Sequence, residues 1–193
     1  MRRISALIVL ALGLAACAQP ELPADHFYRL KVQPPAQGSA RLGGILQIDR
    51  FSADGVTGAR PIAYSRPGQS GELQAYHYHF WTEPPTILLQ NKLAAYLRGA
   101  ELARSVVTPE LRIEPDHAIN AKIIRFERLM SDPPRAVVEI QISLTERTTE
   151  KLIHQGTYWA QEPAKGPAMS ATIDALGIAV ERVFAKFLKD LRG

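Results

Sequence analysis

The sequence predicts an α+β fold, a single domain in which two amphipathic helices pack on a mostly antiparallel sheet. Two kinds of periodicity lead to this prediction. Stretches of alternating apolar and polar residues recur before residue 82 and between residues 119 and 160, whereas residues 86–102 and 170–191 carry apolar side chains at helical spacing. The third observation is length, because 193 residues, 46% of them hydrophobic, suffice for one sizeable core.

The first part of the chain predicts short extended segments separated by turns. Pro34 and Pro35 end the first segment, and the run PGQSG at residues 67–71 has the composition of a turn. The expected elements are, in order, a strand at 26–32, a strand at 44–51, a loop at 52–58 and an extended stretch at 60–65.

The segment 73–81 contains the densest run of aromatic residues and predicts a further strand. Strict alternation would place His77, His79 and Trp81 on one face of it. The opposite face would then carry three aromatic rings, those of Tyr76, Tyr78 and Phe80.

Two helices are expected. The helix at residues 86–102 follows Pro84 and Pro85, which suit a first helical turn, and the closing helix follows a candidate cap at Ser170. The closing helix has a broad apolar stripe formed by Ile173, Leu176, Val180, Val183, Phe184, Phe187 and Leu191. A stripe of this width is typical of a helix that covers a sheet.

Between the two helices, the pattern predicts a short edge strand at Val106 and Val107 and then an antiparallel meander of three strands. The first strand of the meander, at 119–129, loses its apolar phase between Ile123 and Ile124, which predicts a bulge. The second, at 136–145, alternates cleanly, and the third, at 152–160, follows a tight polar link.

Composition excludes several classes of function. The formal net charge of +4 falls near +2 without Arg2 and Arg3, and no run of Lys and Arg follows one face, so a nucleic-acid partner is not expected. Cys17 is the only cysteine, so no disulfide within the chain is possible.

The beginning of the chain predicts a lipoprotein signal. Arg2 and Arg3 precede an apolar run that is too short to span a bilayer, and Leu14-Ala15-Ala16-Cys17 resembles a bacterial lipobox. The expected organisation is a signal peptide at 1–16, a lipidated Cys17 with a tether at 17–25, and a periplasmic domain at 26–193. Because Ala18 and not Asp follows the cysteine, we expect the periplasmic face of the outer membrane; the alternative is an ordinary cleaved signal with an incidental cysteine.

Candidate catalytic and metal-binding residues are few. His77 and His79 share one side of a strand, as two metal ligands could, but no third ligand is near in sequence, and a role at a sheet surface explains them equally. Ser70 lacks the G-x-S-x-G pattern of a hydrolase. Three carboxylates lie in the bend after residue 108, namely Glu110, Glu114 and Asp116. Two of them could act as the acid and base of a glycosidase only if the fold happened to place them at the required separation. We therefore expect no enzyme, no metal and no cofactor.

The aromatic segment has a better functional interpretation as a contact surface. Tyrosine and tryptophan combine a large apolar area with a polar tip and are frequent at interfaces. Tyr76, Tyr78 and Trp81 are accordingly candidate partner contacts, and the alternative is that the aromatic residues fill the core beneath the first helix.

Several short motifs, taken in order, resemble the ABC-type transport auxiliary lipoproteins. They are the lipobox, the F-Y-x-L of Phe27, Tyr28 and Leu30, the R-P-I-A-Y from Arg60 to Tyr64, the aromatic strand ending at Trp81 before two prolines, and the late amphipathic helix. The resemblance extends to lipoproteins of the PqiC type, the partners of MCE-domain proteins.

This resemblance implies a non-enzymatic accessory subunit of a system that moves lipids or other hydrophobic molecules between the inner and outer membranes. The implied partner is an MCE-domain protein, a separate ATPase would hydrolyse ATP, and a homo-oligomer is plausible on symmetry grounds. The alternative function is that of a stand-alone periplasmic lipoprotein that binds a soluble ligand or a cell-wall component.

Overall fold

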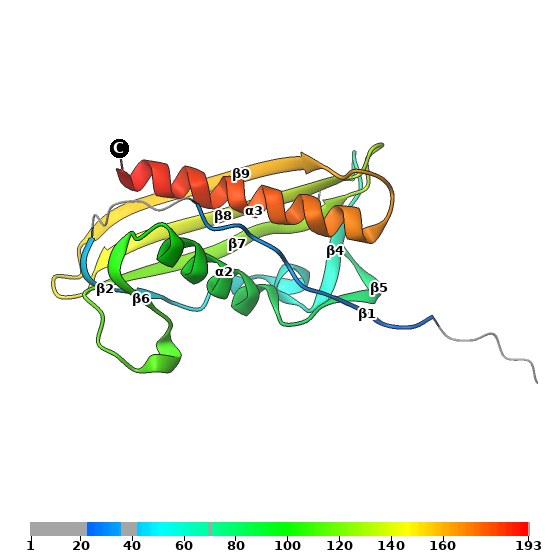
Figure 1. Cartoon of the computed structure of the whole chain (residues 1–193). Helices are drawn as coiled ribbons and strands as arrows, with labels where there is room; N and C mark the ends of the chain where they lie inside the picture. The colour runs from blue at the N-terminus through cyan, green and yellow to red at the C-terminus, as the bar shows by residue number, and fades with distance from the viewer. Residues whose placement is uncertain (1–22, 36–41, 70, 193) are drawn as a thin grey trace, which may run out of the picture.

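The computed structural model describes residues 23–35, 42–69 and 71–192, and it forms one layer of strands covered on one face by two helices (Figure 1). The predicted signal peptide, Cys17 and Ser70 lie outside the described residues. The strands are β1 (His26–Tyr28), β2 (Leu42–Ile48), β3 (Ser52–Ala53), β4 (Pro61–Ser65), β5 (Gln74–Trp81), β6 (Ala103–Val107), β7 (His117–Leu129), β8 (Arg135–Glu146) and β9 (Leu152–Pro163). The helices are α2 (Pro85–Gly99) and α3 (Met169–Arg192), with short 3₁₀ turns η2 (Gly55–Gly58) and η3 (Pro109–Leu111).

The long strand β7 is the centre of the sheet. On one edge it pairs in parallel with β2, then with β3, then with β4, each over two or three residues. On its other edge it pairs with β8 in antiparallel fashion along its whole length. Strand β6 extends the sheet beyond β2, and β5 followed by β1 extends it beyond β4.

The predicted mostly antiparallel sheet is wrong, because the sheet is mixed. Five pairings are parallel, those of β1 with β5, β2 with β6, and β7 with β2, β3 and β4. Alternation within a segment shows that it is a strand but carries no information on the direction of its neighbour, which is set by segments distant in sequence. The predicted meander is confirmed, since β7, β8 and β9 pair in order and antiparallel.

The predicted bulge in β7 is also confirmed. The register between β7 and β8 shifts between Ile123 and Arg125, and the extra residue, Ile124, is 42% exposed. The bulge lets apolar side chains on both sides of it, Ile123 and Phe126, face the core, where both are buried.

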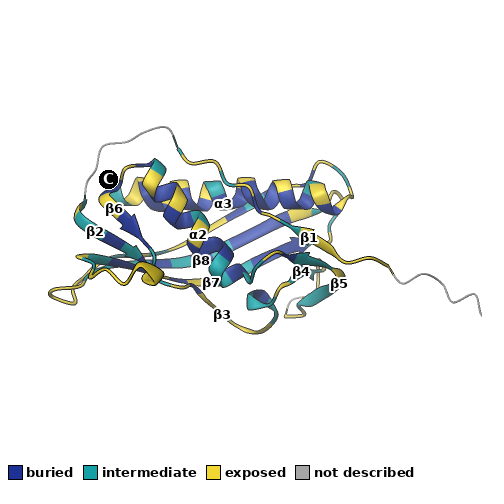
Figure 2. Cartoon of the chain, turned by 60° about the horizontal axis from the view of Figure 1, so that its bottom comes forward, coloured by how far each residue is buried: buried dark blue, intermediate teal, exposed yellow. Residues whose placement is uncertain are grey.

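The core lies between the sheet and the two helices, where Figure 2 colours much of the ribbon dark blue for buried residues. Helix α3 lies over β8 and β9, where the inward residues Val138, Ile140, Ile142 and Leu144 are buried as predicted. Helix α2 lies over β2 and β6, and the two helices meet where the rings of Tyr96 and Phe184 approach to 5.5 Å. Ser170, the expected cap, lies inside the first turn of α3.

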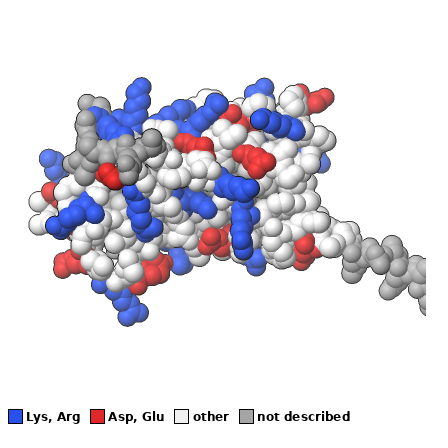
Figure 3. Space-filling model, in the orientation of Figure 1, with Lys and Arg blue, Asp and Glu red and all other residues white. Residues whose placement is uncertain are grey.

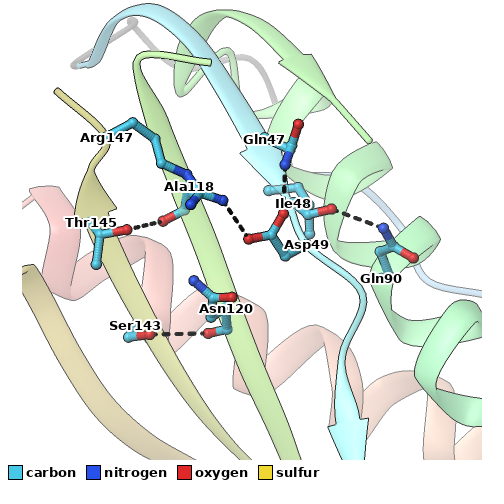
Figure 4. A network of polar contacts seen from close by, with 9 residues as sticks. All are labelled: Gln47, Ile48, Asp49, Gln90, Ala118, Asn120, Ser143, Thr145 and Arg147. Atoms are coloured by element: carbon cyan, nitrogen blue, oxygen red, sulfur yellow. Dashed lines mark hydrogen bonds and ion pairs between the residues drawn. The ribbon is translucent and has the colours of Figure 1, made fainter. Parts of the chain in front are cut away.

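Polar contacts fix the point at which the chain leaves β2 (Figure 4). Asp49 donates its amide to the carbonyl oxygen of Ile119 in β7, and its carboxylate accepts from Arg147 at 2.9 Å. The buried Gln90 of α2 donates to the carbonyl oxygen of Ile48 at 2.9 Å. Since a buried carbonyl without a partner costs about 1–3 kcal/mol, Gln90 holds α2 over the end of β2.

The first strand is shorter than predicted, and the residues after it cross the helices. Only residues 26–28 pair with β5; residues 29–35, the strap, then run over α3 and towards the end of α2 (Figure 1). Leu30 of the strap is buried, and the amide of Gln33 donates to the carboxylate of Glu181 in α3 at 2.6 Å. The strap therefore joins the N-terminal end of the domain to the helix layer.

Gly177 is required where the strap crosses α3. Alanine in a helix interior is favoured over glycine by about 1 kcal/mol, but a Cβ at Gly177 would overlap the backbone carbonyl oxygen of Lys31. We expect Gly177→Ala to lower the free energy of unfolding by about 1–3 kcal/mol in urea denaturation, because the strap must move. Gly43→Ala is the control, since nothing lies within 4 Å of its Cβ position. A Gly177→Ala protein as stable as wild type would contradict this account of the crossing.

Candidate interaction surface at the aromatic edge

Strand β1 brings a second set of aromatic residues against the aromatic strand β5. The two strands pair in parallel, with His26 opposite His79, Phe27 opposite Phe80 and Tyr28 opposite Trp81. The imidazole rings of His26 and His79 stack at 5.3 Å, and the rings of Phe27 and Phe80 at 5.6 Å. We call this end of the sheet the aromatic edge, and its rings lie on both faces of the sheet. It consists of His26, Phe27, Tyr28, Tyr64, Tyr76, Tyr78, His79 and Phe80.

The predicted alternation along β5 is wrong. Pro61 of β4 pairs with Phe80 and Ala63 pairs with Ala75, so three residues of β4 lie opposite six of β5. This irregularity turns the middle of β5, and Tyr76 and His79 come together, with ring centroids 5.4 Å apart in an edge-to-face contact. Tyr76, Tyr78 and Phe80 therefore do not share one face.

The three candidate contact residues differ in exposure. Trp81 is 1% exposed and stacks on Phe126 at 5.0 Å, so its side chain is part of the core. Tyr76 is partly buried, packs on Tyr64 and donates its hydroxyl to the sulfur of Met130. Tyr78 is 38% exposed and is available for contact with a partner.

A hydrogen-bonded histidine lies at the centre of the aromatic edge. Nδ1 of His79 lies 2.8 Å from the hydroxyl of Tyr28. Burial, followed by the nearby His26 and Arg128, holds the pKa of His79 below its ordinary value. Burial also raises the pKa of both Tyr28 and Tyr76, so their hydroxyls stay protonated.

Arginine side chains border the aromatic edge. The guanidinium of Arg60 lies 5.5 Å from the ring centre of Phe27, and that of Arg66 lies 5.7 Å from the ring centre of Tyr64. The buried Arg128 donates to the carbonyl oxygen of Pro167 at 2.8 Å. The sequence interpretation did not place Arg60 against Phe27, because the pairing of β1 with β5 and of β5 with β4 brings them together.

The other candidate residues have separate positions. The described part of the chain contains no group of three or more His, Cys, Asp or Glu side chains placed to hold a metal ion. Asp116 has a structural contact, since its carboxylate accepts the amide of Ile45 at 2.6 Å. Glu110 and Glu114 are exposed in the segment before β7. Among the helices of residues 23–35, 42–69 and 71–192, none is long and apolar enough to cross a bilayer.

These features define a class of protein: a single α+β domain with two helices on one face of a mixed sheet and an aromatic edge at its N-terminal strand. The chain belongs to the family of ABC-type transport auxiliary lipoprotein components, whose model matches residues 28–186. This match confirms the family resemblance found in the sequence. No curated protein matches the chain.

Solved structures agree with the fold. XCC0632 from Xanthomonas campestris has a TM-score of 0.71 at 18% identity, over 86% of this chain and 99% of that one. CT253 from Chlamydia trachomatis has a TM-score of 0.53 at 10% identity, over 79% of this chain and 97% of that one. At these identities the likeness is one of fold alone.

The burial of Trp81 predicts a large effect on stability. We expect Trp81→Ala to lower the free energy of unfolding by about 3–5 kcal/mol, because it leaves a cavity beside Phe126. Tyr78→Ala, three residues away on the same strand, should cost at most about 1 kcal/mol. Chemical denaturation of both variants measures the difference in the free energy of unfolding. Equal losses of stability would contradict the assignment of Trp81 to the core and of Tyr78 to the surface.

The environment of His79 predicts a pH dependence. Because the folded state binds this proton more weakly than the unfolded chain, the contribution of His79 to stability is complete above about pH 6.5 and is lost as the pH falls towards the lower pKa. We expect His79→Phe to lose less stability than wild type between about pH 7 and pH 5.5. The matched control is His77→Phe, at an exposed position. If His79→Phe follows the wild-type curve, His79 is not the responsible group.

Proposed function

We propose that this chain is an outer-membrane-anchored accessory lipoprotein of an MCE/ABC-type system that moves lipids or other hydrophobic molecules between the inner and outer membranes. The observation that carries the proposal is the family match over residues 28–186, to an auxiliary lipoprotein component of ABC-type transport. The resemblance of residues 14–17 to a lipobox supports it. An MCE-domain protein of the inner membrane and periplasm is the proposed partner, and this domain docks it at the outer membrane.

Lipidation of Cys17 is the proposed anchor. A single acyl chain holds a protein only marginally on a bilayer, whereas several chains anchor it stably. Eight residues separate Cys17 from His26, and at about 3.3 Å per residue they reach at most roughly 25 Å. The domain therefore stays close to its membrane, and transfer across the periplasm requires a partner that reaches it.

The proposed role is non-catalytic and needs no cofactor. The family is described as a transport auxiliary component, which accords with a subunit that positions other proteins. Its positioning function would use surface contacts of the kind that exposed aromatic side chains provide.

Strand β9 supplies a surface for assembly. It is twelve residues long and, among the described residues, pairs only with β8. Three of its large apolar side chains are exposed, with Trp159 at 57%, Leu152 at 51% and Ile153 at 44%. A long edge strand with such side chains is a ready site for pairing, so β9 is the proposed contact for a second copy of the chain or for the MCE-domain partner.

One observation favours the alternative of a ligand-binding lipoprotein. The sheet face opposite the helices carries an open cleft with many polar side chains, among them Arg50, Asn120, Lys122, Gln141 and Gln155, and with the apolar Leu152 at its rim. Such a surface suits a polar ligand better than a hydrophobic cargo, and its occupant would not depend on an MCE-domain protein.

Crosslinking and pull-down from the native envelope separate the two functions. We expect the lipidated wild-type protein to fractionate with the outer membrane and to recover an MCE-domain protein. The control, Cys17→Ala, should fold yet be released from the membrane, because it lacks the acyl chains. A Cys17→Ala protein that still fractionates with the outer membrane would exclude Cys17 as the sole anchor. Loss of the MCE-domain protein, under conditions that preserve other envelope complexes, would favour the ligand-binding alternative.

A further inference from the structure

The aromatic edge contains exposed apolar side chains at the end of the domain where the tether begins. Phe27 is 54% exposed, although it lies in a strand and stacks on Phe80. Tyr78 of β5 is 38% exposed, and Met130, whose sulfur accepts the hydroxyl of Tyr76 in β5, is 39% exposed. Contacts within the domain leave these three side chains partly in water.

We propose that the aromatic edge binds the headgroup region of the phospholipid membrane to which the chain is fastened. This inference rests on the proposed lipidation of Cys17. It goes beyond the proposed function by naming the surface through which the folded domain itself contacts lipid.

The path of the chain supports this orientation. The tether leads directly into β1. The orientation of β1 relative to the rest of the domain is fixed, because β1 pairs with β5 and is followed by the buried Leu30 of the strap. The N-terminal chain leaves the molecule at the end that carries β1 and β5 (Figure 1). A short tether attached at a fixed point keeps that end of an elongated domain nearest to the bilayer.

The chemistry of the aromatic edge matches a membrane interface. Tyrosine and other amphipathic rings favour the headgroup level, where the ring contacts acyl chains and the polar tip remains hydrated. Arg60 and Arg66 each lie over a ring of the edge and are exposed, so their guanidinium groups can bind lipid phosphates. Figure 3 shows mostly uncharged surface at this end of the face that it draws.

Cationic side chains also lie at the other outer strands. Lys186 of α3 donates to the backbone carbonyl oxygen of Trp159 in β9 at 2.6 Å and lies 5.7 Å from the centre of its ring. Arg98 of α2 donates to the backbone carbonyl oxygen of Val106 in β6 at 2.8 Å. At the aromatic edge, Arg60 likewise lies over the ring of Phe27 and donates to the carbonyl oxygen of Trp81 at 3.3 Å. The aromatic edge differs from the other outer strands in its position, because the tether leads into β1.

Depth-dependent fluorescence quenching tests the inference on the full lipidated chain. The protein is reconstituted in vesicles of phosphatidylethanolamine and phosphatidylglycerol, and a reporter is introduced as Phe27→Trp. The matched control is Leu152→Trp on β9, because Leu152 is 51% exposed and Phe27 is 54% exposed. The signal of the reporter is the tryptophan emission of the variant minus that of wild type. This signal is measured with two quenchers in turn: lipids that carry a doxyl group near the headgroup, and iodide in the aqueous phase.

We expect the emission added by Phe27→Trp to be lost with doxyl lipids and retained with iodide, and the reverse for Leu152→Trp. Tyr78→Trp provides a second reporter if the first variant does not fold. Quenching of both edge reporters by iodide would overturn the inference, as would protection from both quenchers, which indicates a protein partner over the edge.

Failure of the anchor is measured separately. Mass spectrometry of the purified chain detects the acyl groups, and flotation with the vesicles detects attachment. A chain without acyl groups that does not float contradicts the proposed function. A lipidated chain that floats, while its edge reporters are quenched by iodide, contradicts only the contact between the aromatic edge and lipid.

Discussion

The fold depends on the hydrogen-bonding capacity of one strand, β7, along both of its edges. A strand of thirteen residues presents more backbone donors and acceptors on one edge than any one of the short segments before it can satisfy. The chain meets this requirement with three successive parallel partners, β2, β3 and β4, and with the continuous partner β8 on the opposite edge. The positions of β6, β5 and β1 follow from these pairings, since each is built outwards from β2 or β4.

The same arrangement connects the N-terminus to the helix layer. Since β1 is the outermost strand beyond β4 and β5, the chain must return across the helices to reach β2 on the far side. The strap makes this return, with Leu30 buried and Gly177 providing the space for its backbone. A force applied to the tether would therefore act on β1, on the strap and on α3 together, which suits a domain held by its N-terminus.

The aromatic edge illustrates how sheet topology creates a surface from separate segments. Residues 26–28 and 74–81 each contain aromatic residues, but their rings stack only because β1 pairs with β5 in parallel register. The irregular pairing of β4 with β5 then brings Tyr76 to His79, so that a partly buried polar cluster lies beside exposed rings. Rigid rings held by cross-strand contacts lose little conformational entropy on binding, and this favours their use as a contact surface.

The sequence by itself determined the features that depend on one segment at a time. Periodicity located both helices, the meander of β7, β8 and β9, the inward face of β8 and the bulge at Ile124, because each of these patterns is local. The ordered motifs identified the family, which the match over residues 28–186 confirms. Tertiary structure alone decided the parallel pairings, the placement of residues 29–32 of the predicted strand in the strap, and the separation of buried Trp81 from exposed Tyr78. The physical reason is that strand direction, register and burial are set by contacts between segments distant in the sequence. The spacing of residues within one segment carries no information about those contacts.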